Sequence, residues 1–290
     1  MRIAFCGTGI MGRPMAAKLI EAGHDLHLWN RTPDKANLPG GHIAATPAEA
    51  ARDADVVWVC VSDTAAAERV LLNPADGVLQ SARPGMIVAD SSTISPRASR
   101  EFAARFAERC AAFADCPVTG SKVGAEKGEL IFIVGGEPDP VAKLRPLFEI
   151  MGKRVFHLGG NGMGLAAKLA MNLNIALIYE GFAEGLVLAE KSGIPAARMI
   201  EIISATMLRS GVVEYKSPFV ERRDFSPNFP LRWMQKDIHL MLEHARELRV
   251  KLPALETVEE VYALAGEEGM ADLDYAATLL LLEKWAGIQV

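Results

Sequence analysis

The stretch Gly162–Glu190, GMGLAAKLAMNLNIALIYEGFAEGLVLAE, separates two dissimilar halves of the sequence. It contains no proline and is rich in Ala, Leu and Met, so it predicts one long and largely buried helix. Two polar residues, Lys168 and Asn172, interrupt its apolar face. Because they are four positions apart, they lie one above the other on the same side of the helix. A helix between two domains would place Lys168 at the mouth of an interdomain cleft, where substrate pockets commonly form.

A glycine-rich turn opens the first half of the chain. The apolar run Ile3–Cys6 leads directly into this turn, and a helix-like segment, Pro14–Ala22, follows it. In this context the three glycines allow a tight turn, close approach of a pyrophosphate, and close packing of helix on strand. The turn therefore predicts a Rossmann-type dinucleotide site, and its candidate cofactor-binding residues are Gly7, Thr8, Gly9, Ile10, Met11 and Gly12.

The second strand, Asp25–Trp29, ends in the tripeptide Asn30-Arg31-Thr32. NAD-specific sites usually carry an acidic residue near this position for the ribose 2′-hydroxyl. Here Arg31 can instead form charge-assisted hydrogen bonds with a 2′-phosphate, which a carboxylate would repel. The tripeptide thus predicts NADP(H) as the cofactor, although Arg31 could also be an ordinary solvated turn residue.

Further apolar runs alternate with helix-like segments up to residue 161, which predicts a doubly wound parallel sheet. The predicted strands are Asp55–Val61, Gly85–Asp90, Phe113–Val118, Leu130–Gly136 and Val155–Leu158. Ligands in such sheets gather at the carboxyl ends of the strands. This rule adds Val61, Ser62, Ser92, Thr93 and the segment Val118–Ser121 to the candidate site. We expect a cofactor-binding domain over residues 1–161.

Residues 162–290 show no strand-like alternation and are predicted to form an all-helical substrate and oligomerisation domain. Helices are expected at Pro195–Ala205, Leu231–Arg249, Pro253–Gly266 and Tyr275–Trp285, and a loop at Asp224–Pro230. The last helix is apolar nearly all round, which indicates that it is buried or pairs with another subunit.

Composition restricts the class of protein. The net charge is −5 over 290 residues, which argues against a nucleic-acid partner. None of the four cysteines forms a C-x-x-C pair, and no clustered His/Cys motif suggests a metal. Charged residues interrupt the long helix, so it is not predicted to cross a membrane. The chain passes from Met1-Arg2 directly into a strand without a signal peptide, and we expect a cytoplasmic protein.

A nicotinamide cofactor implies hydride transfer, and reduction of a carbonyl also needs a positioned proton donor. The histidines form no motif, so Lys168 is the better candidate. Burial on an apolar face favours its neutral amine, so the group could both give and take a proton; the alternative is a lysine that extends to solvent. The small residues of the Pro117–Ser121 loop could bind a substrate carboxylate, or they could form an ordinary turn.

These features together resemble the β-hydroxyacid dehydrogenase family over essentially the whole chain. Gly7–Met15 resembles its cofactor fingerprint, and Asp115–Gly120 resembles its substrate motif D-x-P-V-S-G, with Thr119 in place of the serine. Gly162–Asn172 resembles the catalytic block, and Lys236-Asp237 resembles the pair that approaches the nicotinamide. The resemblance implies that Lys168 is the general acid/base and that Asn172 orients the substrate. It also implies that Thr119 and Gly120 hold the substrate carboxylate, and that Thr93 and Lys236 line the cofactor site.

Within the family, the sequence resembles NADPH-dependent glyoxylate/succinic semialdehyde reductases, which act on small aldehyde acids. The residues that carry this resemblance are Asn30-Arg31-Thr32, Gly120-Ser121-Lys122, Phe229-Pro230-Leu231, Gln235-Lys236-Asp237 and Asp272–Tyr275. It implies that Ser121 and Phe229 also contact the substrate and that the protein is a homodimer or homotetramer. Two alternatives remain: a 3-hydroxyisobutyrate or tartronate-semialdehyde type dehydrogenase, which more often uses NAD, and a non-catalytic nucleotide-binding oligomeric module.

Overall fold

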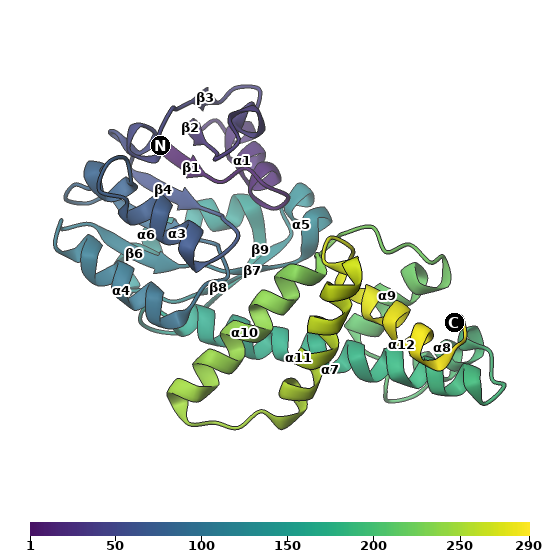
Figure 1. The fold of residues 1–290 in the computed structure, drawn as a ribbon. Helices are drawn as coiled ribbons and strands as arrows, with labels where there is room; N and C mark the ends of the chain where they lie inside the picture. The colour runs from purple at the N-terminus through teal and green to yellow at the C-terminus, as the bar shows by residue number, and fades with distance from the viewer. The chain divides into compact units, whose positions relative to one another are not determined.

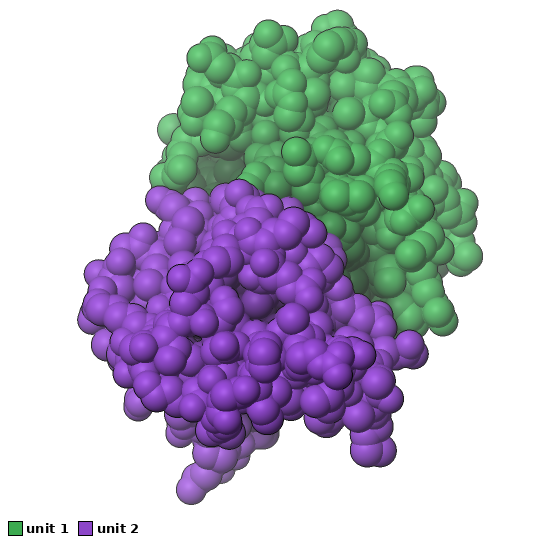
Figure 2. Space-filling view, turned by 90° about the vertical axis from the view of Figure 1, so that its right-hand side faces the viewer, with its two compact units in different colours: residues 1–168 green, residues 169–290 purple.

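The computed structural model describes all 290 residues. The chain forms two compact units, Met1–Lys168 and Leu169–Val290, which are coloured green and purple in Figure 2. No helix in the structure combines the length and the apolar character needed to span a membrane.

A six-stranded parallel sheet is the centre of the first unit (Figure 1). Its strand order is β3-β2-β1-β4-β5-β6. From β1 the chain first adds β2 and β3 on one side, and then crosses over to add β4, β5 and β6 on the other side. This arrangement confirms the predicted Rossmann-type doubly wound sheet. The strands are β1 (Arg2–Cys6), β2 (Asp25–Trp29), β3 (His42–Ile43), β4 (Val56–Val59), β5 (Ile87–Asp90) and β6 (Ala112–Asp115).

Helices cover both faces of this sheet, because alternate strand residues point to opposite sides. Ile3 and Phe5 belong to a core with α1 (Gly12–Glu21) and α6 (Pro138–Met151). Ala4 and Cys6 belong to the opposite core, which includes apolar side chains of α2, α3 and α4. The remaining helices of this unit are α2 (Pro47–Ala51), α3 (Thr64–Leu72), α4 (Pro96–Ala107), α5 (Ser121–Lys127), η1 (Pro33–Ala36) and η2 (Val78–Ser81).

A second, three-stranded sheet was not predicted. It has the order β7-β8-β9, with β7 (Val118–Thr119) antiparallel to β8 (Leu130–Val134) and β8 parallel to β9 (Gly152–His157). The predicted strand Phe113–Val118 is therefore wrong: it is broken between β6 and β7. Pro117 explains the break, because it has no N–H with which to continue the ladder of the large sheet.

The second unit is helical, as predicted. The long helix α7 (Met163–Lys191) begins in the first unit, and its residues from Leu169 onward belong to the second unit. The core of the second unit gathers apolar residues of α7 and of all the later helices. One helix, α9, was missed, because Pro218 lies within it. The elements are α8 (Ala196–Ala205), α9 (Gly211–Glu221), α10 (Leu231–Leu248), α11 (Pro253–Ala265), η3 (Gly266–Met270), η4 (Tyr275–Ala277) and α12 (Thr278–Ala286).

Glu180 is a buried carboxyl in the middle of α7, only 3% exposed. Thr278 Oγ1 donates to its Oε2 at 3.1 Å, whereas its Oε1 has no hydrogen-bond partner. Desolvation by burial raises the pKa of Glu180 from 4.5 to about 7, and the hydrogen bond from Thr278 only partly opposes this shift. The folded state therefore favours the protonated carboxyl more strongly than the unfolded state does.

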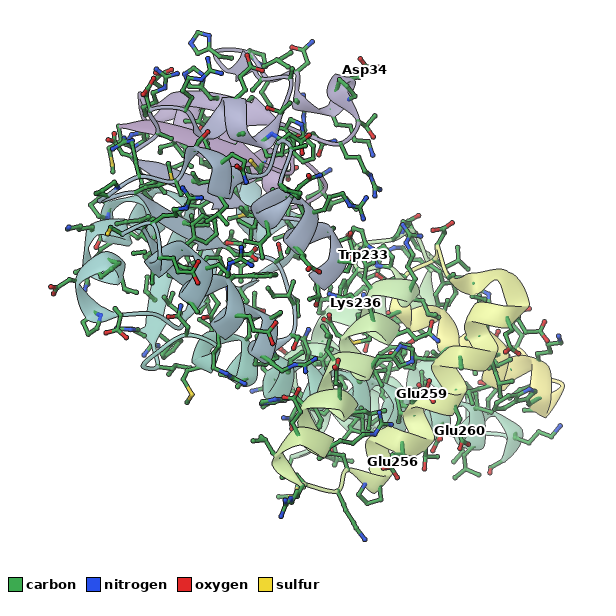
Figure 3. The ribbon with its side chains drawn as sticks, turned by 60° about the vertical axis from the view of Figure 1, so that its left-hand side comes forward. Asp34, Trp233, Lys236, Glu256, Glu259 and Glu260 are labelled. Carbon is green, nitrogen blue, oxygen red and sulfur yellow. The ribbon has the colours of Figure 1, made fainter.

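This shift predicts a pH-dependent loss of stability. Well below pH 4.5 the group is protonated in both states, and between about pH 4.5 and 7 the free energy of unfolding falls by up to about 3 kcal/mol in total. Glu180→Gln should remove that loss, so the variant should be more stable than the parent at pH 8 and little changed at pH 4.5. Urea unfolding across this range measures it, with Glu260→Gln on the exposed face of α11 as the control (Figure 3). Identical pH profiles for Glu180→Gln and the parent protein would contradict the assignment.

Candidate active site

The glycine turn after β1 leaves open space where a dinucleotide phosphate could approach. A Cβ on Gly7 would lie 2.2 Å from the Cys60 carbonyl oxygen, and one on Gly12 would lie 1.9 Å from the Gly7 carbonyl oxygen. A Cβ on Gly9, in contrast, would meet nothing within 4 Å. Two glycines thus close the turn against the sheet while the third faces open space. No side chain caps the first turn of α1, whose N–H groups suit a phosphate.

Hydrogen bonds attach the Asn30–Asn37 loop to this turn. The Thr8 amide donates to Asn30 Oδ1 at 3.0 Å, and Asn30 Nδ2 donates to the Thr32 carbonyl oxygen at 2.9 Å. The Lys35 carbonyl oxygen accepts from Thr8 Oγ1 at 2.7 Å and from Arg13 Nη1 at 3.2 Å. The loop is therefore anchored through its backbone and through Asn30.

Arg31 and Thr32 are exposed within this anchored loop, so their polar groups are accessible to a ligand. The acidic residue of the loop, Asp34, projects from η1 (Figure 3). None of the three residues directly after β2, Asn30, Arg31 and Thr32, carries a carboxylate. These three positions carry an amide, a guanidinium and a hydroxyl instead.

The ends of β4 and β5 bring four further predicted residues, Val61, Ser62, Ser92 and Thr93, to the same edge of the sheet. The two strands pair in parallel, and the Val61 amide donates to Ser92 Oγ at 2.8 Å. This bond joins the segment that contains Val61 and Ser62 to the segment that leads into Thr93. Ser62 is exposed and Thr93 is half-buried, so both side chains are at least partly accessible at this edge of the sheet.

The predicted Pro117–Ser121 loop is partly a strand, which corrects the sequence interpretation. Val118 and Thr119 form β7, and the left-handed region is reached only at Gly120 (φ +134°) and Ser121 (φ +57°). A non-glycine residue such as Ser121 adopts this conformation at a cost in strain, and such strain is common at functional sites. Gly120 is exposed, while Thr119 and Ser121 are half-buried beside it.

Asp115, at the end of β6, holds the beginning of α7. It is fully buried and accepts hydrogen bonds from the backbone amides of Gly162 and Leu165 and from the hydroxyl of Ser99. Burial raises its pKa, and these hydrogen bonds oppose the shift. The sequence motif that contains Asp115 predicts no role for this residue. The sequence feature that could have indicated a structural role is an acidic residue in an apolar strand, two positions before Pro117.

Lys168 and Asn172 follow on α7, one turn apart, as predicted. Lys168 is 8% exposed and Asn172 only 1%, so neither is a surface residue of the helix. Asn172 Nδ2 donates to Asp237 Oδ2 at 2.7 Å, and this bond directs the amide oxygen of Asn172 away from the carboxylate. That oxygen is buried and has no hydrogen-bond partner within the protein, so it is available to a bound group.

Asp237 also connects Asn172 to Lys236. Lys236 Nζ lies 2.9 Å from Asp237 Oδ1, and both residues project from α10, where Figure 3 labels Lys236. The family resemblance pairs Lys236 with Asp237, but nothing in the sequence connects either of them to Asn172. Asn172 and Asp237 are 65 positions apart, so no short-range sequence pattern predicts their contact.

A buried ion pair fixes the turn that contains Phe229. Asp274 Oδ1 accepts from Lys216 Nζ at 2.6 Å, and its Oδ2 accepts from the amides of Asn228 and Phe229 at 3.1 Å each. The Phe229 carbonyl oxygen in turn accepts from the Tyr275 amide at 2.9 Å. The predicted substrate residue Phe229 thus lies in a backbone turn that a charged pair in the core of this unit holds in place.

Two family models together match nearly the whole chain. The NAD-binding domain of 6-phosphogluconate dehydrogenase matches residues 2–159. A model described as the NAD-binding domain of NADP-dependent 3-hydroxyisobutyrate dehydrogenase matches residues 162–282. The second match includes the part of the chain that carries Lys168, Asn172, Phe229 and Lys236.

Relatives and solved structures agree with these matches. The chain is 33% identical to 2-hydroxy-3-oxopropionate reductase of Escherichia coli K12, over 99% of this chain and 98% of that protein. It is 32% identical to glyoxylate/succinic semialdehyde reductase 1 of Arabidopsis thaliana, over 96% and 97%. The structure of Mycobacterium tuberculosis 3-hydroxyisobutyrate dehydrogenase with L-serine superposes with a TM-score of 0.88 at 31% identity, over 97% of this chain and 98% of that one. The chain therefore belongs to the β-hydroxyacid dehydrogenase family and is an NAD(P)-dependent oxidoreductase.

Proposed function

We propose that this enzyme uses NADPH to reduce small aldehyde acids, such as glyoxylate and succinic semialdehyde, to the corresponding hydroxy acids. The observation that carries the proposal is the arrangement on α7, where Lys168 lies one turn before an Asn172 that Asp237 holds by its amide nitrogen. A buried amine next to a fixed amide suits proton delivery to a bound carbonyl oxygen. The likeness to the Arabidopsis glyoxylate/succinic semialdehyde reductase supports this class of substrate.

Most of the proposed cofactor contacts come from residues of the first unit. We infer that the glycine turn receives the pyrophosphate, that Arg31 and Thr32 bind the 2′-phosphate, and that Asn30 holds the loop in place. Bound NADPH supplies the hydride that reduces the substrate carbonyl. The full set of proposed cofactor residues is Gly7, Thr8, Gly9, Ile10, Met11, Gly12, Asn30, Arg31, Thr32, Val61, Ser62, Thr93 and Lys236.

The substrate is held at its two ends in this proposal. Thr119, Gly120 and Ser121 bind the carboxylate, with Phe229 against the apolar part of the substrate. Lys168 gives a proton to the oxygen that gains charge as the carbonyl is reduced, and Asn172 fixes the orientation of that oxygen. Holding both ends places the carbonyl carbon for reaction, and such positioning contributes strongly to rate.

The two parts of the chain have separate roles in this account. We propose that residues 1–161 form the NADP-binding domain and that residues 162–290 form the substrate and oligomerisation domain. The boundary is placed in the segment Gly159–Gly162, before α7 begins at Met163. We further propose a cytoplasmic homodimer or homotetramer.

A second candidate function lies in the same family. Thr119 stands where the family motif usually has serine, and its extra methyl group narrows the space beside the carboxylate. The likeness to the E. coli 2-hydroxy-3-oxopropionate reductase, whose substrate is also called tartronate semialdehyde, favours a shorter or hydroxylated aldehyde acid. The likeness to a 3-hydroxyisobutyrate dehydrogenase structure favours oxidation of a hydroxy acid instead.

Steady-state kinetics separates these candidates. We would measure kcat/KM with NADPH and with NADH for reduction of glyoxylate, succinic semialdehyde and tartronate semialdehyde, and with both oxidised cofactors for oxidation of 3-hydroxyisobutyrate and L-serine. The proposal predicts the highest kcat/KM for glyoxylate or succinic semialdehyde with NADPH. Preferred oxidation of 3-hydroxyisobutyrate with NAD⁺ would establish the second candidate in its place.

Arg31→Asp tests the cofactor assignment. Removing the guanidinium deletes charge-assisted hydrogen bonds to the 2′-phosphate, and the new carboxylate repels it, so NADPH binding should weaken by roughly 100-fold. NADH lacks this phosphate, and its affinity should change by less than about threefold. Fluorescence titration with both cofactors measures the difference. Arg52→Asp, a change of the same charge at another exposed position of this unit, is the control. Equal losses for NADPH and NADH would exclude the role.

A further inference from the structure

We propose that Asp115 is a positioning residue, which sets the place of Lys168 by fixing the first turn of α7. The proposal rests on the proposed role of Lys168 as the proton donor, and it adds a residue that does not itself touch substrate or cofactor. Asp115, α7 up to Lys168 and the elements that hold them all belong to the first unit.

The carboxylate of Asp115 takes the place of a side-chain cap for this helix. Its Oδ1 accepts from the Gly162 amide at 2.7 Å and from Ser99 Oγ at 2.9 Å, while its Oδ2 accepts from the Leu165 amide at 3.0 Å. Amides at the start of a helix have no partner within the helix, and the positive end of the helix dipole favours a carboxylate there. The acceptor, Asp115, belongs to a strand 47 positions before Gly162 in the chain, so these hydrogen bonds join α7 to the large sheet.

Steric contacts limit the same turn from the other side. A Cβ on Gly164 would lie 2.5 Å from the Ile133 carbonyl oxygen and 2.7 Å from the Gly135 amide nitrogen. A Cβ on Gly135 would lie 2.7 Å from Asp115 Oδ2. The helix backbone therefore lies directly against the ends of β6 and β8, with no side chain to separate them. There is little room for the turn to shift without a clash or a lost hydrogen bond.

Lys168 is tied to this turn by helix geometry. It follows Leu165 by three positions, so a movement of the amide that Asp115 holds carries the lysine with it. Asp115 also immediately precedes the segment that leads to Thr119 and Gly120, the proposed carboxylate-binding residues. One buried carboxylate thus fixes the proton donor relative to the part of the site that binds the other end of the substrate. A misplacement of about 1 Å in such an arrangement can cost roughly 100-fold in rate.

Asp115→Asn is the first test. An asparagine can accept with only one of its two positions, so its NH₂ group would face either the Gly162 or the Leu165 amide, donor against donor. We expect kcat to fall by about 10- to 100-fold. The Kd for NADPH and the KM for the aldehyde acid should change by less than about threefold, because neither ligand contacts this residue. Ser99→Ala removes a bond to Asp115 but leaves both bonds to α7, so its kcat should stay within about threefold of the parent value.

A double-mutant cycle with Lys168→Ala distinguishes positioning from a general structural role. If Asp115 acts through Lys168, then Asp115→Asn should lower kcat by less than about twofold in the Lys168→Ala background. Losses that multiply in the double variant would overturn the proposal. Active Lys168→Ala would instead remove the proposed function. In that case, hydrogen exchange still tests the fixed turn: Asp115→Asn should speed exchange at the Gly162 and Leu165 amides, and unchanged exchange would refute it.

Gly164→Ala displaces the same turn without touching the carboxylate. Its methyl group meets two backbone atoms, so we expect kcat to fall by at least 10-fold while NADPH binding persists. Gly160→Ala is the matched control, because a Cβ on Gly160 would meet nothing within 4 Å. Equal kcat values for Gly164→Ala and Gly160→Ala would contradict the claim that the place of this turn controls the rate.

Discussion

Lys168→Ala is expected to lower kcat for aldehyde reduction by about 1,000-fold, because a positioned proton donor contributes on this scale. Without the amine, the alkoxide that forms must take its proton from water. The Kd for NADPH should change by less than about threefold, since the proposed cofactor contacts are made by other residues. Single-turnover kinetics with NADPH and glyoxylate measures the chemical step, and fluorescence titration measures cofactor binding.

Two further variants sharpen this result. Lys168→Met keeps most of the apolar stem of the side chain and removes only the amine, so it should lose as much activity as Lys168→Ala. Lys191→Ala, at the exposed end of the same helix, is the control and should leave kcat unchanged. If Lys168→Met retained parental activity, proton transfer by this residue would be ruled out.

Asp274→Ala should lower the free energy of unfolding by about 3–5 kcal/mol, the usual cost of removing one partner from a buried ion pair. The substitution leaves the Lys216 ammonium buried at 2% exposure and deprives the amides of Asn228, Phe229 and Ala276 of their acceptor. Burial already lowers the pKa of Lys216, and Asp274 is the group that opposes the shift. Urea unfolding followed by circular dichroism measures the loss.

Lys216→Met should lower the free energy of unfolding by less than Asp274→Ala does. In this variant Asp274 keeps its three backbone hydrogen-bond donors, and the methionine side chain still fills the core. The control is Glu268→Ala, which breaks the exposed pair between Lys284 and Glu268, with a separation of 2.6 Å. Exposed pairs contribute about 0–1 kcal/mol, so this change should be small. Similar losses for Glu268→Ala and Asp274→Ala would show that the buried pair is not what stabilises the helical unit.

The sequence predicts the parts of the fold that depend on short-range patterns. Buried parallel strands appear as continuous apolar runs such as Val56–Val59. The glycine turn after β1 has the G-x-G-x-x-G spacing that is typical of dinucleotide-binding turns. The shared side of Lys168 and Asn172 follows from helix periodicity alone. These elements were predicted because each depends on residues that are neighbours along the chain.

Features that join distant segments could not be predicted in this way. The strand β7 has only two residues and pairs antiparallel to β8, so no alternation marks it. Helices α6 and α9 contain internal prolines, which normally argue against helix. The roles of Asp115 and Asp237 depend on partners about 50 or more positions away. A single sequence does not specify such pairs, whereas the folded backbone brings them together.

The most direct test of the central claim is a crystal structure of the enzyme with NADP⁺ and a product hydroxy acid bound together. The quantity to measure is the distance from Lys168 Nζ to the carbinol oxygen of the product. We predict a hydrogen bond of about 3 Å, with the nicotinamide C4 facing the carbinol carbon. A Lys168 amine that points into bulk water, with another group bonded to the carbinol oxygen, would contradict the account.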